Sequence, residues 1–178
     1  MKLIILDRDG VINADSDQFV KSPEEWRALP GSLEAIARLN QAGYHVVIAT
    51  NQSGLGRGLF DMSTLNAMHL KMHKALAQAG GRIDAIFYCP HTNTSGCTCR
   101  KPNPGMFRAI GERFNTPLER VPAVGDSLRD LQAAASVGAQ PILVHTGKGA
   151  KTLADGNLPA GTRTFEDLAQ VARALART

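Results

Sequence analysis

Five short apolar runs, separated by stretches of helical periodicity, constrain the fold of this chain more than any other feature. The runs are rich in Val and Ile, as expected for strands buried on both faces, and cover residues 3–6, 44–49, 85–88, 121–124 and 141–144. Apolar residues recur at helical spacing over residues 33–39, 65–76, 106–114, 128–135 and 165–176. This alternation predicts an α/β fold with a doubly wound parallel sheet and right-handed crossovers.

Two segments depart from the alternation. Residues 13–30 are polar, contain Trp26, and are expected to form a flap over the strand ends. Residues 91–101 have neither a helical nor a strand pattern. No linker rich in Gly or Pro divides the 178 residues, so a single domain over residues 1–178 is predicted.

The charge and hydropathy of the chain bear on which ligands, nucleic acids or membranes it could bind. The net charge of +4 and pI near 9.2 suit a phosphorylated ligand, but no clustered basic tract favours nucleic acid. Asp7 and Asp9 end the apolar opening too early for a signal peptide, and no later run could cross a bilayer. We expect a cytoplasmic monomer with no membrane partner.

Polar motifs follow three of the predicted strands. Asp7 and Asp9 follow the first run, Thr50 the second, and Asp126 and Asp130 the fourth. In doubly wound sheets ligands bind outside the carboxyl ends of the strands, so these groups are expected to converge at one sheet edge. A carboxylate nucleophile, a second carboxylate, a hydroxyl donor and a remote pair for a cation predict phosphoryl transfer.

The cysteines and a histidine form a second constellation. Cys89, His91, Cys97 and Cys99 lie within residues 89–101 at spacings that can close a tetrahedral zinc site. The alternatives are a disulfide, which leaves an odd cysteine, or buried unreactive thiols. With four protein ligands the zinc would be structural, and it would fix the loop that ends with the cationic residues Arg100 and Lys101.

The motifs resemble the haloacid dehalogenase superfamily of phosphatases. Its four motifs match residues 7–10, Thr50, Lys101 and residues 125–130 in order. The resemblance implies a Rossmann-like sheet without a large cap domain. It also implies that Asp130 supports the metal ligands from outside.

The resemblance implies a mechanism as well. Asp7 would attack phosphorus to form an aspartyl-phosphate, with Mg²⁺ held by Asp7, Asp126 and the backbone carbonyl of Asp9. Asp9 would protonate the leaving oxygen and then activate water, a role that suits a carboxyl whose pKa is raised by nearby acids. Thr50 would donate to the phosphoryl oxygens and Lys101 would neutralise them.

The cysteine loop narrows the resemblance. Cys-Pro-His followed by Cys-x-Cys-Arg-Lys-Pro is similar to phosphatases that remove the 7-phosphate of D-glycero-D-manno-heptose 1,7-bisphosphate in ADP-heptose and lipopolysaccharide biosynthesis. Histidinol-phosphate phosphatases are close relatives and stay an alternative. A zinc-loop module that binds nucleic acid on an inactive core is another. In the heptose family the substrate contacts match Asp15, Ser16, Asp17, Gln18, Asn51, Gln52, Ser53 and Arg100.

A glycine-rich segment and two histidines are weaker indications of function. The glycines of residues 54–58 have the wrong spacing for a dinucleotide loop and favour a flexible substrate loop. Arg57 within it is interpreted as a contact for a distal phosphate or as a solvated side chain. His69 and His73 have metal-compatible spacing but no carboxylate partner, so a solvated helix face is expected.

Overall fold

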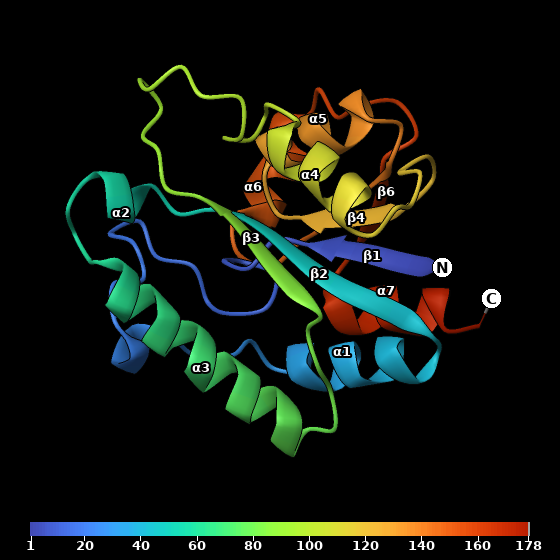
Figure 1. Cartoon of the computed structure of the whole chain (residues 1–178). Coiled ribbons are helices and arrows are strands. Elements are labelled where there is room, and N and C mark those ends of the chain that lie inside the picture. Colours follow the sequence, from blue (N-terminus) through green and yellow to red (C-terminus); the bar gives the residue numbers. More distant parts are fainter. Residues whose placement is uncertain (178) are drawn as a thin grey trace.

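A computed structural model describes residues 1–177 and contains a six-stranded parallel sheet. The strand order is β3-β2-β1-β4-β5-β6 (Figure 1). The bounds are β1 Lys2–Leu6, β2 Tyr44–Asn51, β3 Ala85–Cys89, β4 Pro122–Gly125, β5 Gln140–Val144 and β6 Arg163–Phe165. The chain leaves β1 toward β2 and later returns to its other side with β4, so the switch point lies between β1 and β4.

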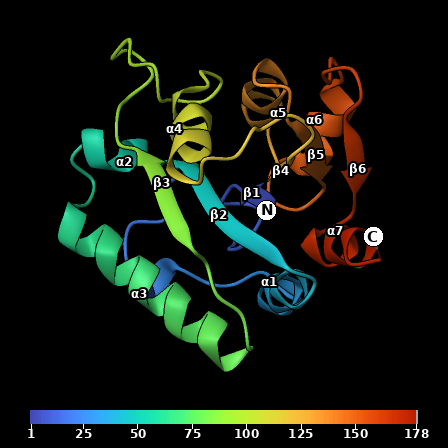
Figure 2. The ribbon, with the colours of Figure 1, turned by 45° about the vertical axis from the view of Figure 1, so that its right-hand side comes forward.

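Helices cover both faces of the sheet. In Figures 1 and 2, α1, α3 and α7 lie on one side, and α4 and α5 lie on the other. The helix bounds are η1 Pro23–Glu25, α1 Ser32–Gln41, α2 Ser53–Gly56, α3 Met62–Gln78, α4 Gly105–Arg113, α5 Leu128–Ser136, α6 Gly149–Asp155 and α7 Leu168–Leu175. Alternate β1 residues point to two separate apolar cores, because Ile4 packs with α1, α3 and α7 while Ile5 packs with α4 and α5. The predicted doubly wound sheet is confirmed.

Three short elements differ from the sequence prediction. Phe165 belongs to the edge strand β6 and not to the last helix, which begins at Leu168. Residues 149–155 form α6, and residues 53–56 form α2 where a flexible loop is predicted. These elements are three to seven residues long, so a periodic apolar pattern is hard to detect in them.

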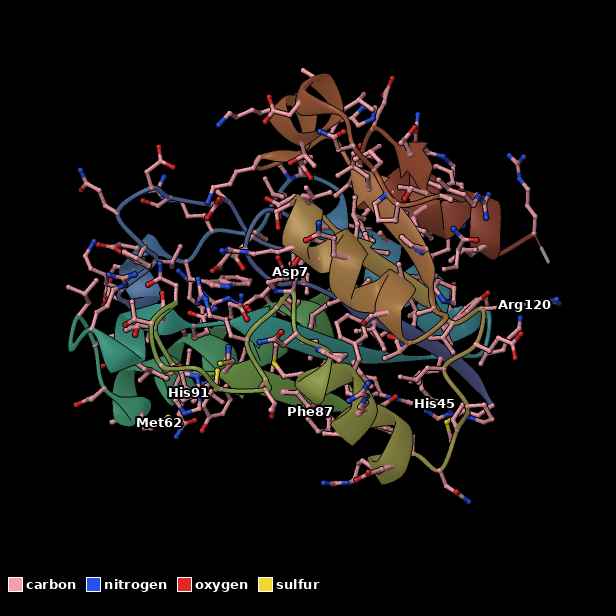
Figure 3. The ribbon with its side chains drawn as sticks, turned by 90° about the horizontal axis from the view of Figure 1, so that it is seen from above. Asp7, His45, Met62, Phe87, His91 and Arg120 are labelled. Atoms are coloured by element: carbon pink, nitrogen blue, oxygen red, sulfur yellow. The ribbon has the colours of Figure 1, made fainter. Side chains whose placement is uncertain are left out.

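The loops beyond the carboxyl strand ends form one rim of the molecule. Residues 13–30 run along this rim, but Trp26 is only 2% exposed and packs in the core with Val20, so the segment is anchored and not a free flap. Residues 90–104 join the carboxyl end of β3 to α4, and Arg100 and Lys101 in this loop line the same cavity as Asp15 and Ser16 of residues 13–30. Figure 3 shows His91 on this rim and His45 and Arg120 at the opposite end of the strands. Within residues 1–177, no helix combines the length and apolarity needed to cross a membrane.

Candidate active site and metal centres

Three carboxylates meet at the switch point. Asp7 follows β1, whereas Asp126 and Asp130 follow β4, and one oxygen from each lies within 4.8 Å of the others. Gly10 permits this approach, since it has φ of 85° and a Cβ at this position would overlap the Asp126 carboxylate. Groups that are distant along the chain therefore form one acidic cluster, as the strand-end motifs predict.

Lys101 and the start of α5 fix Asp130. The Lys101 ammonium lies 2.8 Å from Oδ1 of Asp130, 3.3 Å from Oδ1 of Asp7 and 2.7 Å from the carbonyl oxygen of Ala49. The other Asp130 oxygen accepts hydrogen bonds from the backbone N–H groups of Asp126 and Ser127 and from the Ser127 hydroxyl. Both oxygens of Asp130 are engaged, which suits a residue that orients Asp126.

Burial and mutual repulsion disfavour the charged forms of Asp7 and Asp126. Burial, followed by the charges of Asp130 and Asp9, raises the pKa of Asp7 to about 7, although Lys101 opposes the shift. Burial and the charges of Asp7 and Asp130 raise the pKa of Asp126 to about 8. Lys101 holds the pKa of Asp130 below its usual value despite burial. A divalent cation between Asp7 and Asp126 would relieve this repulsion, so these donors fit Mg²⁺.

Asp9 differs from the sequence expectation. Burial alone would raise its pKa, but the Arg8 guanidinium and hydrogen bonds from Asn13 and Gln52 outweigh burial and lower it. Arg8 is fully buried and donates to Oδ1 of Asp9 from Nε at 2.9 Å and from Nη2 at 2.7 Å. The predicted raised pKa is wrong because the sequence does not show that Arg8 turns back onto the next residue.

Residues 50–52 bridge the cluster and the cysteine loop. The Thr50 hydroxyl accepts from Nε2 of Gln52 at 3.0 Å, and the same nitrogen lies 3.2 Å from Oδ2 of Asp9. The Asn51 side chain pairs with the backbone N–H and C=O of Lys101 at 3.1 and 3.2 Å. The Asn51 side chain therefore lines the cavity and also fixes the backbone of Lys101.

A polar cavity of about 210 Å³ opens above Asp7. Most residues predicted to contact a ligand line it: Asp7, Asp9, Asp15, Ser16, Asp17, Asn51, Gln52, Ser53, Arg57, Arg100 and Lys101. Gln18 is exposed and does not line it. Thr50 and Asp126 are buried beneath its lining, at 1% and 3% exposure.

The sequence prediction missed four lining residues. Phe19 and Val20 close one side, while Arg129 and Lys148 add two cations. Lys148 follows β5, so the strand-end argument that identified Asp7 could have found it. Arg129 lies inside the Asp126 to Asp130 motif. His69 is also buried, at 8% exposure, and contacts Arg8, so the expected solvated helix face is wrong for this residue.

The predicted zinc ligands converge at the base of their loop. Sγ of Cys89 lies 3.4 Å from Nδ1 of His91, 3.7 Å from Sγ of Cys97 and 3.0 Å from Sγ of Cys99. Zn–S bonds of about 2.3 Å in a tetrahedron place sulfur atoms about 3.7 Å apart, which matches the separation of Cys89 and Cys97, whereas Cys89 and Cys99 are closer than this. One donor atom from each of the four residues lies within 4.8 Å of the others, so the cluster could hold a metal ion. The three cysteines are free thiols, which argues against the disulfide alternative.

Comparisons with known proteins agree with this geometry. The model of the polynucleotide kinase 3 phosphatase family matches residues 2–132, and the HAD-hydrolase-like family model matches residues 98–171. The D-glycero-β-D-manno-heptose-1,7-bisphosphate 7-phosphatase of Bordetella bronchiseptica is 70% identical over 98% of both chains, and that of Pseudomonas putida is 55% identical over 98% of this chain and 99% of its own.

Solved structures extend the agreement to three dimensions. A crystal structure of the D,D-heptose 1,7-bisphosphate phosphatase from B. bronchiseptica, complexed with magnesium and phosphate, has a TM-score of 0.98, 69% identity and 99% coverage of both chains. The Burkholderia thailandensis phosphatase has a TM-score of 0.81, 58% identity and full coverage of both chains. The chain is a phosphoric monoester hydrolase with a haloacid dehalogenase-like fold, and it belongs to the family of D-glycero-β-D-manno-heptose-1,7-bisphosphate 7-phosphatases.

Proposed function

We propose that this chain removes the 7-phosphate of D-glycero-β-D-manno-heptose 1,7-bisphosphate through an aspartyl-phosphate on Asp7. The supporting observation is the cluster of the half-buried Asp7 with the buried Asp126 and Asp130, next to a cation-lined cavity. The relatives at 70% and 55% identity carry this activity in their names, which favours the heptose bisphosphate over histidinol phosphate. The reaction would serve ADP-heptose and lipopolysaccharide biosynthesis in the cytoplasm.

Asp7 is proposed as the nucleophile. The backbone N–H of Arg8 donates to its Oδ1 at 2.8 Å, and Lys101 lies 3.3 Å from the same oxygen, so Oδ2 is the less engaged atom. Attack by Asp7 on phosphorus forms one P–O bond while the bond to the sugar oxygen breaks. Lys101 and the Thr50 hydroxyl would offset the charge that develops on the phosphoryl oxygens.

Asp9 is proposed as the general acid and base. Its lowered pKa means that it is ionised in the free site at neutral pH. A phosphate dianion in the cavity would raise that pKa, so the proton would be held by Asp9 only when substrate is bound. Asp9 would donate this proton to the leaving sugar oxygen and then accept one from the water that hydrolyses the aspartyl-phosphate.

Mg²⁺ would be held by the Asp7 and Asp126 carboxylates and the backbone carbonyl of Asp9. When bound, it offsets the repulsion between the Asp7 carboxylate and the phosphate. Asp130 would orient Asp126, because Lys101 and the start of α5 occupy its own oxygens.

The rest of the cavity would bind the sugar and its second phosphate. Arg57, Arg100, Arg129 and Lys148 provide four cations around the opening, and burial followed by Arg129 lowers the pKa of Arg100. Such a crowd of like charges suits an anionic ligand. Asp15, Ser16 and Asp17 face the same space and would accept hydrogen bonds from sugar hydroxyls. Gln18 is exposed and would contact the sugar only in a bound state in which its side chain turns toward the cavity.

The cysteine cluster is proposed to bind zinc as a structural ion. Four protein donors leave no open position for water, so the metal would not be a Lewis acid for the reaction. Cys99 directly precedes Arg100 and Lys101, which both line the cavity, and Lys101 also lies 3.3 Å from Oδ1 of Asp7. Zinc would hold residues 89–101, as an insertion within one domain of residues 1–178, in the conformation that places these cations.

A phosphate-release screen tests the function. Purified protein with Mg²⁺ is compared on heptose 1,7-bisphosphate, heptose 7-phosphate, histidinol phosphate and a 3′-phosphorylated oligonucleotide. The heptose bisphosphate is expected to have the highest kcat/KM, and Asp7→Asn is expected to have no turnover with an unchanged fold. A preference for histidinol phosphate or the oligonucleotide would refute the proposed substrate, and activity in Asp7→Asn would refute the nucleophile. Steep salt-dependent oligonucleotide binding without phosphate release would instead support the nucleic-acid module.

A further inference from the structure

The two oxygens of Asp9 have different surroundings. Oδ1 accepts three hydrogen bonds, from Nε and Nη2 of Arg8 at 2.9 and 2.7 Å and from Nδ2 of Asn13 at 2.9 Å. Oδ2 has one contact, with Nε2 of Gln52 at 3.2 Å. A carboxylate oxygen that already accepts three hydrogen bonds is a poor site for a proton, whereas Oδ2 retains free lone pairs.

Arg8 is itself held by a residue from another element. Its third nitrogen, Nη1, lies 3.1 Å from Nε2 of His69, which lies on α3. A guanidinium is always charged and only donates, so Nε2 of His69 must accept and its ring proton must be on Nδ1. Burial, followed by the Arg8 charge, lowers the pKa of His69 to about 4, in agreement with a neutral ring.

The arrangement fixes all three nitrogens of a buried side chain. The Arg8 guanidinium is fully buried and His69 is 8% exposed, so water does not readily replace either partner. Without His69, Nη1 would lack its acceptor, and only the two hydrogen bonds to Oδ1 of Asp9 would orient the guanidinium. His69 does not line the cavity, so we expect its influence on the reaction to pass through its contact with Arg8.

We propose that Arg8 and His69 are positioning residues that saturate Oδ1 of Asp9 and leave Oδ2 as the oxygen that exchanges the proton with substrate and water. This inference rests on the proposed acid and base role of Asp9. It assigns functions to a fully buried cation and to a histidine on a distant helix that the motifs alone do not link to catalysis. Arg8 serves both carboxylates of its motif, since its backbone N–H holds Asp7 and its side chain holds Asp9.

The primary test compares three variants on α3. His69→Leu removes the acceptor, His69→Gln retains a neutral acceptor, and His73→Leu is the control one helical turn away at an exposed position. Loss of a hydrogen bond to a charged group is expected to lower kcat for heptose bisphosphate about 10- to 100-fold in His69→Leu, with KM changed less than about twofold. His69→Gln should recover most of this loss and His73→Leu should match the wild type.

A second readout separates positioning from a loss of structure. With p-nitrophenyl phosphate the phenolate leaves without a proton, so the burst of phenolate that reports phosphorylation of Asp7 should stay close to wild type in His69→Leu. Steady-state turnover should fall, because water activation still needs Asp9. A burst that falls in parallel with turnover would overturn the proposal. If His69→Leu does not fold, Arg8→Lys provides the same test, since an ammonium cannot hold Asp9 and His69 together.

A double-mutant cycle with Asp9→Asn distinguishes the possible failures. His69→Leu should have no further effect on the residual turnover of Asp9→Asn, because both changes act on one proton transfer. Independent, multiplicative losses would overturn the Arg8 and His69 assignment while the role of Asp9 stands. Full activity in Asp9→Asn would overturn the role of Asp9 in the proposed function, and this inference with it.

Discussion

Neutralising Asp7, the proposed nucleophile, is expected to stabilise the protein while it abolishes turnover. Burial and the neighbouring carboxylates raise the pKa of Asp7 from 3.8 to about 7, so the folded state disfavours its charge. This difference in pKa between the unfolded and folded states corresponds to a free energy of about 4 kcal/mol. Asp7→Asn retains the shape and an oxygen acceptor for the backbone N–H of Arg8 but has no charge.

The sign of the effect follows from linkage. Because the folded pKa of Asp7 is above the unfolded value, its favourable contribution is complete below about pH 3.8 and is lost as the pH rises through about 7. Metal-free Asp7→Asn should therefore be more stable than wild type by up to about 4 kcal/mol at pH 8.5, and the difference should shrink toward zero near pH 4. Urea unfolding at several pH values measures it.

The control is a carboxylate with the opposite shift. Asp61 caps α3, where hydrogen bonds from Thr64 lower its pKa, so Asp61→Asn should not stabilise the protein at pH 8.5. Magnesium is removed by dialysis without a chelator, so that the cysteine cluster keeps its metal. If metal-free Asp7→Asn is less stable than wild type at pH 8.5, the argument that these carboxylates repel one another is refuted.

Three further predictions concern the metals and Lys101. The rise in melting temperature on adding Mg²⁺ should be larger at pH 8.5 than at pH 6, because Asp7 and Asp126 hold protons below about 7 and 8, and equal rises would contradict this. Four donors hold about one zinc ion, so Cys99→Ser should lower the zinc content below about one ion per chain. It should also reduce phosphate release more than about tenfold at saturating Mg²⁺. Full activity without zinc would contradict the structural role of the ion. Lys101→Met should lower kcat by about 10²- to 10³-fold and destabilise the fold by about 3–5 kcal/mol in urea unfolding, since it leaves the half-buried Asp7 and the buried Asp130 without their cation. A loss of less than threefold in kcat would exclude Lys101 from the reaction.

The fold could be predicted where its elements are long and apolar. The runs ending at Asp7, Thr50 and Asp126 are buried on both faces, so composition alone distinguishes them from loops. β6 is three residues long and begins with an exposed Arg163, and no pattern separates it from a surface loop. The same logic explains why the last helix was predicted to begin too early.

The site could be predicted in part for a similar reason. Acidic residues after apolar strands are conspicuous, whereas Arg129 and Lys148, although Lys148 also follows a strand, resemble by residue type the many solvated cations of any surface. The direction in which Arg8 turns depends on the packing of α3, a contact between residues 61 positions apart. Side-chain direction of this kind is a tertiary property, which is why the lowered pKa of Asp9 was not predicted.

The two carboxylates of one short motif thus have opposite electrostatic settings. Asp7 faces Asp126 and Asp130 across the switch point, and its pKa is raised, whereas Asp9 faces the Arg8 guanidinium, and its pKa is lowered. A cation bound to the Asp7 cluster would therefore favour the charged form of Asp7, the proposed nucleophile, while the hydrogen bonds to Asp9 come from other groups. Because separate groups control the two ionisations, the proposed mechanism can keep Asp7 charged while bound substrate determines when Asp9 carries a proton.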